Sequence, residues 1–341
     1  MATIKDVAKL AGVAVSTASY ALNQSSKVAP QTARKVIDAA QTLNYQKNGI
    51  ARDLKRNKTD TILLILHNLA GPFYSELVRG VQDTLQSLNY GLIACSSMGG
   101  RNSTASRFLA ERRADGAIIL ASNLGDQEIE RAARKDFPIV VLDRLILNHD
   151  SIMSVIVDNK SGGYKAAQHL IDRGHRDIAY INGPIDSRDN LQRRKGFEQA
   201  MEEASIPVHP KWLLQGGFTR QGGYLATKML ILQGDLPSAI FAGNDEMAIG
   251  AMNALKEAGI KVPKEISVVG FDDIEMSRYT SPQLTTVSQA NYEVGSLSAH
   301  LIYRSIKEKI VKNDYIMPTE LIVRDSSREQ MKGVRGNRDK V

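Results

Sequence analysis

Most of the chain alternates between short, continuously apolar runs and amphipathic helical patterns, beginning at Thr61. Residues 62–66 form the first apolar run, and residues 74–88 form the helical pattern that follows it. Strands that are apolar on both sides need helices on both faces of their sheet, which is typical of parallel α/β structure. Further apolar runs lie at 90–96, 117–120, 139–142, 178–181, 239–242 and 267–270. We therefore predict a body built of parallel sheets covered by helices.

The segments that follow these apolar runs are rich in polar and aromatic side chains. Parallel sheets bind ligands at the carboxyl ends of their strands. A sugar presents paired hydroxyls and flat C–H faces, which suit carboxylates, amides, guanidinium groups and aromatic rings. The candidates are His67, Asn68, Phe73, Tyr74, Ser122, Asn123, Asp143, Arg144, Asn182, Arg193, Phe218, Asn244, Asp245, Asp272, Asp273 and Gln289. Individually, Asn244 and Asp245 could cap a helix and Phe218 could be core, but together the candidates predict a site for a small polar ligand.

Charge is distributed unevenly along the 341 residues. Residues 1–60 hold ten Lys and Arg against four acids, and residues 328–341 hold five against two, although the whole chain carries only +7. The intervening part is therefore mildly acidic. A basic N-terminal module suits the phosphate backbone of nucleic acids, and an ordinary solvated basic face is the alternative.

The N-terminal region contains three short helical patterns. Thr3 precedes the first, with Asp6 three residues later, and Gly12 ends it. The second runs from near Val15 to Asn23. Pro30 opens the third, which has an apolar stripe of Val36, Ile37, Ala40 and Leu43.

The second helical pattern has two different faces. Ala18, Ala21 and Leu22 point in similar directions, towards the other helices. The side chains on the free face are Val15, Ser16, Ser19 and Tyr20. A short helix with an exposed N-terminal face is the geometry that enters the major groove of DNA, although the periodicity alone also fits any three-helix bundle.

The letters GVAVSTASYALN and KVAPQTARKVIDAAQTLNY resemble the DNA-binding headpiece of the lactose/galactose repressor family of bacterial transcription regulators. The matching positions are Thr3, Asp6, Val7, Ala8, Ala11, Gly12, Val13, Thr17, Ser19, Leu22 and Asn23. The resemblance implies base reading by Val15, Ser16 and Tyr20. It implies further DNA contacts, chiefly to phosphates, from Thr3, Thr17, Ser19, Asn23, Thr32 and Tyr45. Ala14 replaces the usual serine cap, and Tyr20 stands where arginine is common.

Residues 48–56 match the hinge pattern of the same family. This segment is too short and polar to be a stable helix alone, so its folding would need DNA and a partner chain. The resemblance implies DNA contacts from Asn48, Ala51 and Leu54. A leucine flanked by cations can be wedged between base steps in the minor groove, which makes Leu54 the candidate wedge. The alternative is that residues 47–59 are a simple basic linker.

The resemblance continues to about residue 328 and implies an α/β effector domain of periplasmic-binding-protein type. The implied domains are a helix-turn-helix headpiece at 1–46, a hinge at 47–59, a first lobe at 60–160 with 291–318, a second lobe at 161–290 with 319–328, and a basic, disordered tail at 329–341. The effector positions are Phe73, Tyr74, Asp143, Arg193, Phe218, Asn244, Asp272 and Gln289, with Arg193 and Asp272 recognising hydroxyls. Arg193, Arg144 and His67 near one cleft would also permit a phosphorylated or acidic sugar.

These features predict a homodimeric repressor that binds a pseudo-palindromic operator in double-stranded DNA under control of a sugar-type effector. The effector would either release or strengthen DNA binding. The tail has no leucine heptad for a four-chain coiled coil. His300 stands where the family's carbon-catabolite regulator docks a phosphorylated carrier protein through an arginine, so we expect no such corepressor.

Two other classes of protein are weighed against this prediction. An enzyme is disfavoured because the sequence has no P-loop, GxSxG, HExxH or CxxC motif, although Cys95 with His169 or His175 could pair as a nucleophile and base. We expect no catalytic residues, cofactor or metal. A sugar-binding module without a DNA target would fit residues 61–327 but not residues 1–60. No apolar run approaches the roughly 18 residues of a membrane span, and we expect a cytoplasmic, nucleoid-associated protein.

Overall fold

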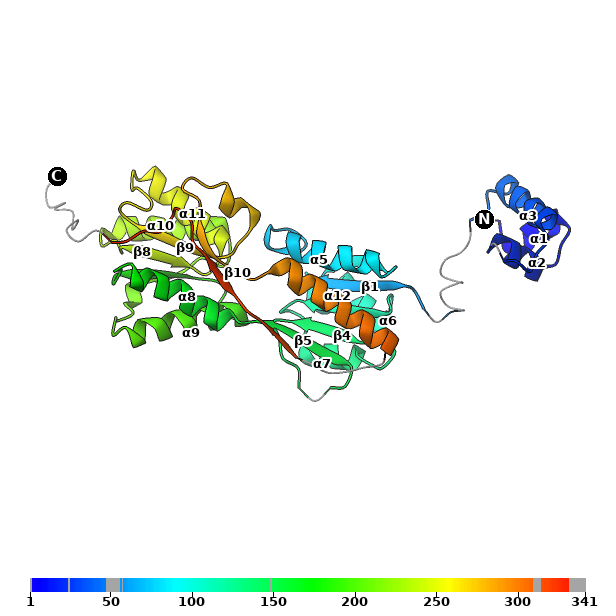
Figure 1. The fold of residues 1–341 in the computed structure, drawn as a ribbon, viewed down its shortest axis with the longest axis horizontal. Helices are drawn as coiled ribbons and strands as arrows, with labels where there is room; N and C mark the ends of the chain where they lie inside the picture. The colour runs from blue at the N-terminus through cyan, green and yellow to red at the C-terminus, as the bar shows by residue number, and fades with distance from the viewer. Residues whose placement is uncertain are drawn as a thin grey trace. The chain divides into compact units, whose positions relative to one another are not determined.

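Two units make up the chain, Met1–Thr59 and Asp60–Val341. The structure, a computed structural model, describes residues 2–23, 25–46, 56, 58–147, 149–308 and 314–330. Figure 1 shows the helices and strands of both units. Among the described residues, no helix has both the length and the apolar character needed to cross a bilayer.

The N-terminal unit is a bundle of three helices, α1 (Ile4–Ala11), α2 (Val15–Leu22) and α3 (Pro30–Thr42). A capping box formed by Thr3 and Asp6 begins α1, and Gly12 ends it in the left-handed conformation with φ 67°. No side chain caps α2, because its N-cap residue is Ala14. The three predicted helix starts are confirmed.

The core of this bundle is narrow, and the predicted stripe on α3 is partly wrong. Val36, Ala39 and Ala40 are buried, but Ile37 is 41% exposed. Two short neighbouring helices cover only one narrow side of α3, and Ile37 lies about 100° around the helix from Val36, beyond their reach. The buried residues of the bundle are Val7, Ala8, Ala18, Ala21, Val36, Ala39 and Ala40.

The first lobe of the larger unit contains a six-stranded sheet in the order β11-β5-β4-β3-β1-β2, in which each paired strand is parallel to its neighbour. Its strands are β1 (Thr61–Leu66), β2 (Gly91–Ser96), β3 (Gly116–Leu120), β4 (Ile139–Leu142), β5 (Ile152–Val157) and β11 (Tyr315–Met317). Helices α5 (Phe73–Ser87) and α12 (Asn291–Glu308) pack on one face, and α6 (Thr104–Glu111) and α7 (Asp126–Ala132) on the other. The side chains of β1 alternate between these two faces, so the whole apolar run is buried. Leu63 and Ile65 pack against α6 and α7, whereas Ile62, Leu64 and Leu66 pack against α5 and α12.

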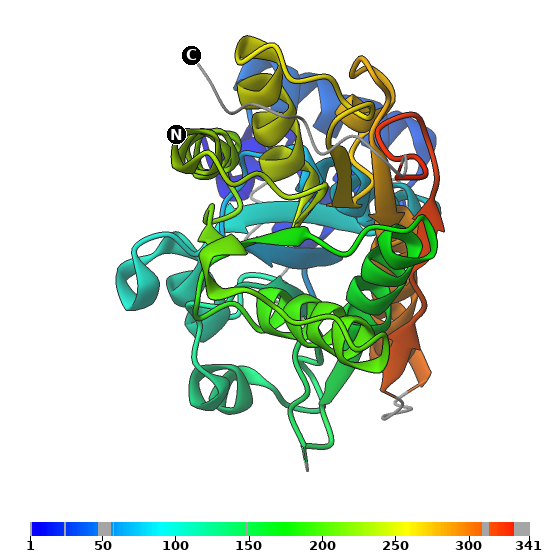
Figure 2. The ribbon, with the colours of Figure 1, turned by 90° about the vertical axis from the view of Figure 1, so that its left-hand side faces the viewer.

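The second lobe contains a six-stranded sheet in the order β12-β10-β9-β8-β6-β7. Its strands are β6 (Ile178–Asn182), β7 (Leu213–Gln215), β8 (Ala239–Ala242), β9 (Ser267–Asp272), β10 (Thr285–Ser288) and β12 (Glu320–Ile322). Helices α8 (Asn159–Asp172) and α9 (Arg188–Glu203) cover one face, and α10 (Arg220–Gln233) and α11 (Asp245–Glu257) the other (Figure 2). Three 3-10 helices complete the described elements, η1 (Gly100–Asn102), η2 (Pro210–Trp212) and η3 (Glu275–Arg278).

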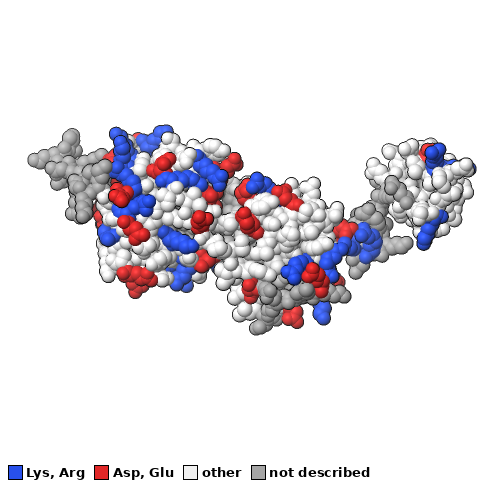
Figure 3. Space-filling view, in the orientation of Figure 1, with Lys and Arg blue, Asp and Glu red and all other residues white. Residues whose placement is uncertain are grey.

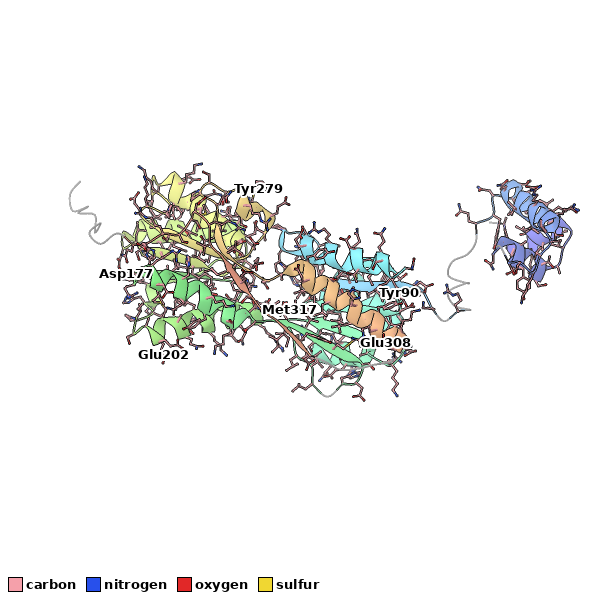
Figure 4. The ribbon with its side chains drawn as sticks, in the orientation of Figure 1. Tyr90, Asp177, Glu202, Tyr279, Glu308 and Met317 are labelled. Atoms are coloured by element: carbon pink, nitrogen blue, oxygen red, sulfur yellow. The ribbon has the colours of Figure 1, made fainter. Side chains whose placement is uncertain are left out.

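Three connections cross between the lobes: after β5, after β10, and between β11 and β12. Met317, labelled in Figure 4, ends β11 at the third crossing. Strand β12 runs antiparallel to β10, so the second sheet is not wholly parallel as the sequence predicts. The reason is topological: β10 leaves the second lobe towards the first, whereas β12 enters from it. The chain then continues to Gln330, whose backbone N–H donates to the Arg173 carbonyl at 2.8 Å.

Close contact between α8 and α9 depends on two glycines. A Cβ atom on Gly196 would lie 2.0 Å from the Lys160 carbonyl oxygen, and one on Gly163 would lie 2.1 Å from the Arg193 carbonyl oxygen. Both distances are impossible for real atoms, so the two backbones meet only because these residues have no side chain. This contact places Arg193 of α9 beside Asn159 at the start of α8.

Candidate functional site

The free face of α2 is exposed at the positions predicted to read bases. Val15 is 42% and Tyr20 46% exposed, and Ser16 is also exposed, whereas Ala18 and Ala21 are buried. The Lys27 ammonium lies 5.5 Å from the centre of the Tyr20 ring, which adds positive charge to this face. The face is therefore accessible to a nucleic acid.

The residues predicted to contact the DNA backbone differ in their exposure. Thr3 and Asn23 are exposed, whereas Thr17, Ser19, Thr32 and Tyr45 are half-buried. The predicted hinge contacts Asn48, Ala51 and Leu54 lie outside the described residues.

Thr3 also has a structural role. Its backbone N–H and its hydroxyl donate to the Asp6 carboxylate at 2.8 Å and 2.7 Å, and these bonds lower the pKa of Asp6. The single hydroxyl proton of Thr3 is donated to Asp6, so the hydroxyl can donate to a phosphate only if it exchanges this bond.

A cavity of about 760 Å³ lies between the two lobes of the larger unit. Side chains at the carboxyl ends of strands in both sheets line it, as expected for parallel sheets. Seven of the eight predicted effector residues are among them, namely Phe73, Tyr74, Asp143, Arg193, Phe218, Asn244 and Asp272. The eighth, Gln289, is fully buried one hydrogen bond behind Asp272.

Arg193 lies at the centre of the polar network in this cavity. Its Nε donates to Asn159 Oδ1 at 2.8 Å, and its Nη1 donates to the Gly243 carbonyl at 2.7 Å and to Asp272 Oδ1 at 3.1 Å. The guanidinium plane stands 3.9 Å from the centre of the Phe271 ring. Both side chains of the Arg193–Asp272 pair are about 5% exposed or less, so the pair is rigidly held.

Asp272 ends β9 with a positive φ of 114°, which turns its carboxylate into the cavity. Gln289 Nε2 donates to the same oxygen that Arg193 binds, at 2.5 Å. Burial raises the pKa of Asp272 to about 7, although Arg193 and Gln289 oppose the shift. Gln289 Oε1 is buried and has no hydrogen-bond partner among the described residues.

Asp143 reaches the cavity from the first lobe. The Val157 N–H donates to Asp143 Oδ1 at 3.0 Å, and the residue has a φ of 52°. Burial, together with the nearby Asp189 carboxylate, raises the pKa of Asp143 to about 8. Burial also raises the pKa of Asp189. The cavity thus holds at least three carboxyl groups that resist ionisation.

Asp189 is a cavity residue that the sequence reading missed. It occupies the first turn of α9, four residues before Arg193, so both side chains lie on one face of the helix. Its spacing of one helical turn from Arg193 is the signal in the sequence that marks it.

Asn244 and Asp245 both have structural roles in addition to their position among the predicted site residues. Asn244 caps α11 by accepting the Met247 N–H at 2.9 Å, and its amide donates to the Phe218 carbonyl. Asp245 is fully buried and accepts hydrogen bonds from the Thr286 hydroxyl and the Ile274 N–H. Asn244 therefore both caps a helix and lines the cavity.

Two charged candidates, Asp273 and Arg144, are held by ion pairs and hydrogen bonds to other protein groups. Asp273 pairs with Arg324 at 2.5 Å. Arg144 donates to the Leu124 and Ala121 carbonyls and to Asp126. These Arg144 partners all belong to the first lobe.

The possible nucleophile pair does not assemble. Cys95 lies on β2 of the first lobe, where burial raises the pKa of its thiol to about 11. His169 and His175 lie in the second lobe, hydrogen-bonded to Ser327 and Ser238 respectively. These contacts give no activated thiolate.

The chain has full-length relatives. Residues 3–48 match the family described as bacterial regulatory proteins, lacI family, and residues 167–327 match the periplasmic binding protein-like domain. The HTH-type transcriptional repressor PurR of Histophilus somni (strain 129Pt) is 37% identical over 331 residues, which cover 96% of this chain and 99% of that protein. The chain belongs to the lacI family of bacterial regulatory proteins.

Solved structures of family members have the same fold. A lac repressor dimer bound to operator and the anti-inducer ONPF matches with a TM-score of 0.82 and 30% identity, covering 96% of this chain and 99% of that one. A complex of the transcriptional regulator CelR with cellobiose matches with a TM-score of 0.70 and 29% identity, covering 96% and 100%. The predicted fold class, a helix-turn-helix domain before a periplasmic-binding-protein-like domain, is confirmed.

The chain is therefore a DNA-binding transcriptional repressor of the lacI family with a ligand-binding domain. Its relatives are repressors and not enzymes, which rules out the enzyme alternative. Membership of a DNA-binding family likewise rules out a sugar sensor with no DNA target.

Proposed function

We propose that this repressor works as a homodimer whose affinity for a pseudo-palindromic operator is controlled by an uncharged sugar or related polyol bound between its lobes. The cavity of about 760 Å³, lined by residues of both lobes, is the observation that carries this proposal. A ligand that contacts both lobes stabilises one relative arrangement of them. A change in that arrangement would alter hinge folding and so DNA affinity.

The chemistry of the cavity supports a sugar. Phe73 and Tyr74 meet edge to face with ring centres 5.2 Å apart, and Phe218 offers a third ring from the opposite lobe. Carboxyl groups from Asp143 and Asp272 can accept or donate hydrogen bonds to paired hydroxyls. A related regulator has been solved in complex with cellobiose.

The charge balance supports an uncharged ligand over a phosphorylated or acidic one. The lining includes six carboxylates and three arginines. Arg193 and Arg144 already donate to protein acceptors, and Arg188 lies 3.9 Å from Asp126. A phosphate would therefore enter a site with six carboxyl groups and few free hydrogen-bond donors, where its charge has little to compensate it.

A thermal-shift screen of the full chain tests this proposal. The panel contains neutral mono- and disaccharides, their phosphates, and purine bases as flat compounds that could stack on the aromatic rings. We expect a neutral sugar to raise the midpoint of unfolding, since a ligand that binds only the folded state stabilises it. Any hit is then added to an operator filter-binding assay in graded salt, which shows whether it weakens or strengthens specific retention. Stabilisation by phosphorylated compounds or purine bases alone would contradict the proposal.

The same proposal assigns base reading to Val15, Ser16 and Tyr20, with backbone contacts from Thr3, Thr17, Ser19, Asn23, Thr32 and Tyr45 and minor-groove contacts from Asn48, Ala51 and Leu54. Exposure of the first three supports their role. Tyrosine offers one hydroxyl and an apolar ring edge, so it cannot make the two parallel bonds by which arginine selects guanine.

Tyr20→Arg is expected to shift operator preference towards guanine at one symmetric pair of positions. A bidentate arginine–guanine contact discriminates by roughly 1–3 kcal/mol. Selection from a randomised operator library measures the shift. Tyr20→Phe, which keeps the ring, serves as the comparison, and an unchanged motif for Tyr20→Arg would show that position 20 does not read bases.

An apolar stripe on α10 supports the homodimer. Leu225, Met229 and Leu232 lie four and three residues apart and are 52%, 55% and 82% exposed, so they share one face of the helix. An exposed apolar stripe is typical of a protein interface.

Met229→Lys is expected to weaken self-association by about thirtyfold or more, because it places a charge in the centre of this stripe. Sedimentation velocity over a range of protein concentrations measures the change. Leu191→Lys alters an exposed leucine on α9 and should leave association unchanged. Equal dimerisation of Met229→Lys and the unaltered protein would place the interface elsewhere.

A further inference from the structure

A second hollow, of about 900 Å³, lies wholly in the first lobe, between α6 and α7. Four arginines from separate segments line it: Arg101 of η1, Arg107 of α6, Arg131 of α7 and Arg134 just after α7. All four are exposed. The hollow therefore brings four guanidinium groups to the rim of one concave surface.

These arginines lack the carboxylate partners that neighbouring arginines have. Arg112 pairs with Asp136, Arg113 with Glu111, and Arg144 with Asp126. In the part of the chain that the structure describes, none of the four lining arginines forms an ion pair. By contrast, Figure 3 shows acidic and basic side chains interspersed over much of the second lobe.

The acids in the lining do not balance this charge. Asp126 is held by Arg144 at 2.9 Å and lies 3.9 Å from Arg188. Glu128 is the other lining acid and is half-buried. Four guanidinium groups thus face one free carboxylate, and a bound anion would relieve their mutual repulsion.

The shape of the hollow indicates what kind of anion fits. Arg101 and Arg107 come from the η1 and α6 side of the lining, and Arg131 and Arg134 come from the α7 side. A single phosphate can accept only a few of the many N–H donors that four guanidinium groups present, whereas linked phosphates can engage both sides at once.

We propose that this hollow is a second ligand site, which binds a small molecule carrying two or more phosphate groups. The site is separate from the cavity between the lobes, which offers such a ligand few free hydrogen-bond donors. The two hollows share Gly125 and Asp126 at the start of α7, so the second site adjoins the first without overlapping its polar centre.

Calorimetric titration of inorganic tripolyphosphate into the full chain, in about 150 mM salt to suppress weak surface binding, tests the proposal. The unaltered protein should bind with saturation at one site per chain. Arg107→Ala/Arg131→Ala should weaken binding at least tenfold, and Arg101→Ala/Arg134→Ala should do the same, so that failure of one variant to fold leaves the other informative.

Two control variants remove the same number of cations elsewhere. Arg79→Ala/Arg304→Ala alters two arginines on α5 and α12 that are paired with Glu76 and Glu308. Arg34→Ala/Lys35→Ala alters the basic DNA-binding unit. Both should bind tripolyphosphate as the unaltered protein does. Absence of saturable binding, unchanged binding in both pocket variants, or an equal loss in either control would overturn the proposal.

Discussion

Arg193→Met is expected to lower the free energy of unfolding by roughly 3–5 kcal/mol and to weaken effector binding by about a hundredfold or more. The substitution keeps most of the apolar stem against Phe271 but removes the only cation bonded to Asp272 among the described residues. It also leaves the Asn159 and Gly243 oxygens without their donor. Urea unfolding and titration with a sugar identified in the thermal-shift screen measure the two effects separately.

A double variant separates the electrostatic cost from the loss of recognition. Arg193→Met/Asp272→Asn also removes the buried carboxyl group that has lost its cation, so part of the lost stability should return, although the Asn159 and Gly243 oxygens still lack their donor. Effector binding should remain weak, because neither the guanidinium nor the carboxylate is present to meet ligand hydroxyls. A double variant no more stable than Arg193→Met would show that lost packing, and not an unpaired charge, accounts for the destabilisation.

The sequence predicted the strands that are continuous apolar runs, including β2 at a sheet edge, but it missed β5 and β10 inside the sheets and the shortest strands. Residues 62–66 and 139–142 are continuous apolar runs, and both are strands at the predicted positions. Strands β7, β11 and β12 have only three residues each. Their pairing depends on partners far along the chain, as when Tyr315 pairs with Val155. No local pattern carries that information.

The candidate cavity was largely predictable because most of its residues follow from the topology of parallel sheets. Residues just after parallel strands meet at one edge of the sheet, so Asp143 after β4 and Asp272 at the end of β9 were found from spacing alone. Asp189 was missed because it belongs to a helix, and only its spacing from Arg193 marks it. The commitment of Arg144 to first-lobe carbonyls was equally invisible, because those contacts require folded loops.

Asp143→Asn is expected to stabilise the protein more at pH 8.5 than at pH 5, with a difference of roughly 1–3 kcal/mol between the two gains. Folding raises the pKa of Asp143 from 3.8 to about 8, so the folded protein binds more protons than the unfolded chain between these values. Stability from this group therefore falls as the pH rises through that window. Asparagine resembles the protonated acid, can still accept the Val157 N–H, and tolerates the φ of 52°.

The variant is compared with the unaltered protein at each pH, because His169 changes the free energy of unfolding with pH in the direction opposite to Asp143. Burial lowers the pKa of His169 from 6.5 to about 4, so its contribution to stability is complete above pH 6.5 and is lost as the pH falls towards 4.

Urea unfolding at both pH values isolates the Asp143 difference, and Asp136→Asn, at an exposed ion pair with Arg112, serves as the control. A gain for Asp143→Asn that is equal at pH 5 and pH 8.5 would mean that Asp143 is not held protonated by its surroundings. A gain that is larger at pH 8.5 than at pH 5 would show that Asp143 is held protonated by its surroundings, and a neutral effector would then meet a hydroxyl donor as well as acceptors in the cavity.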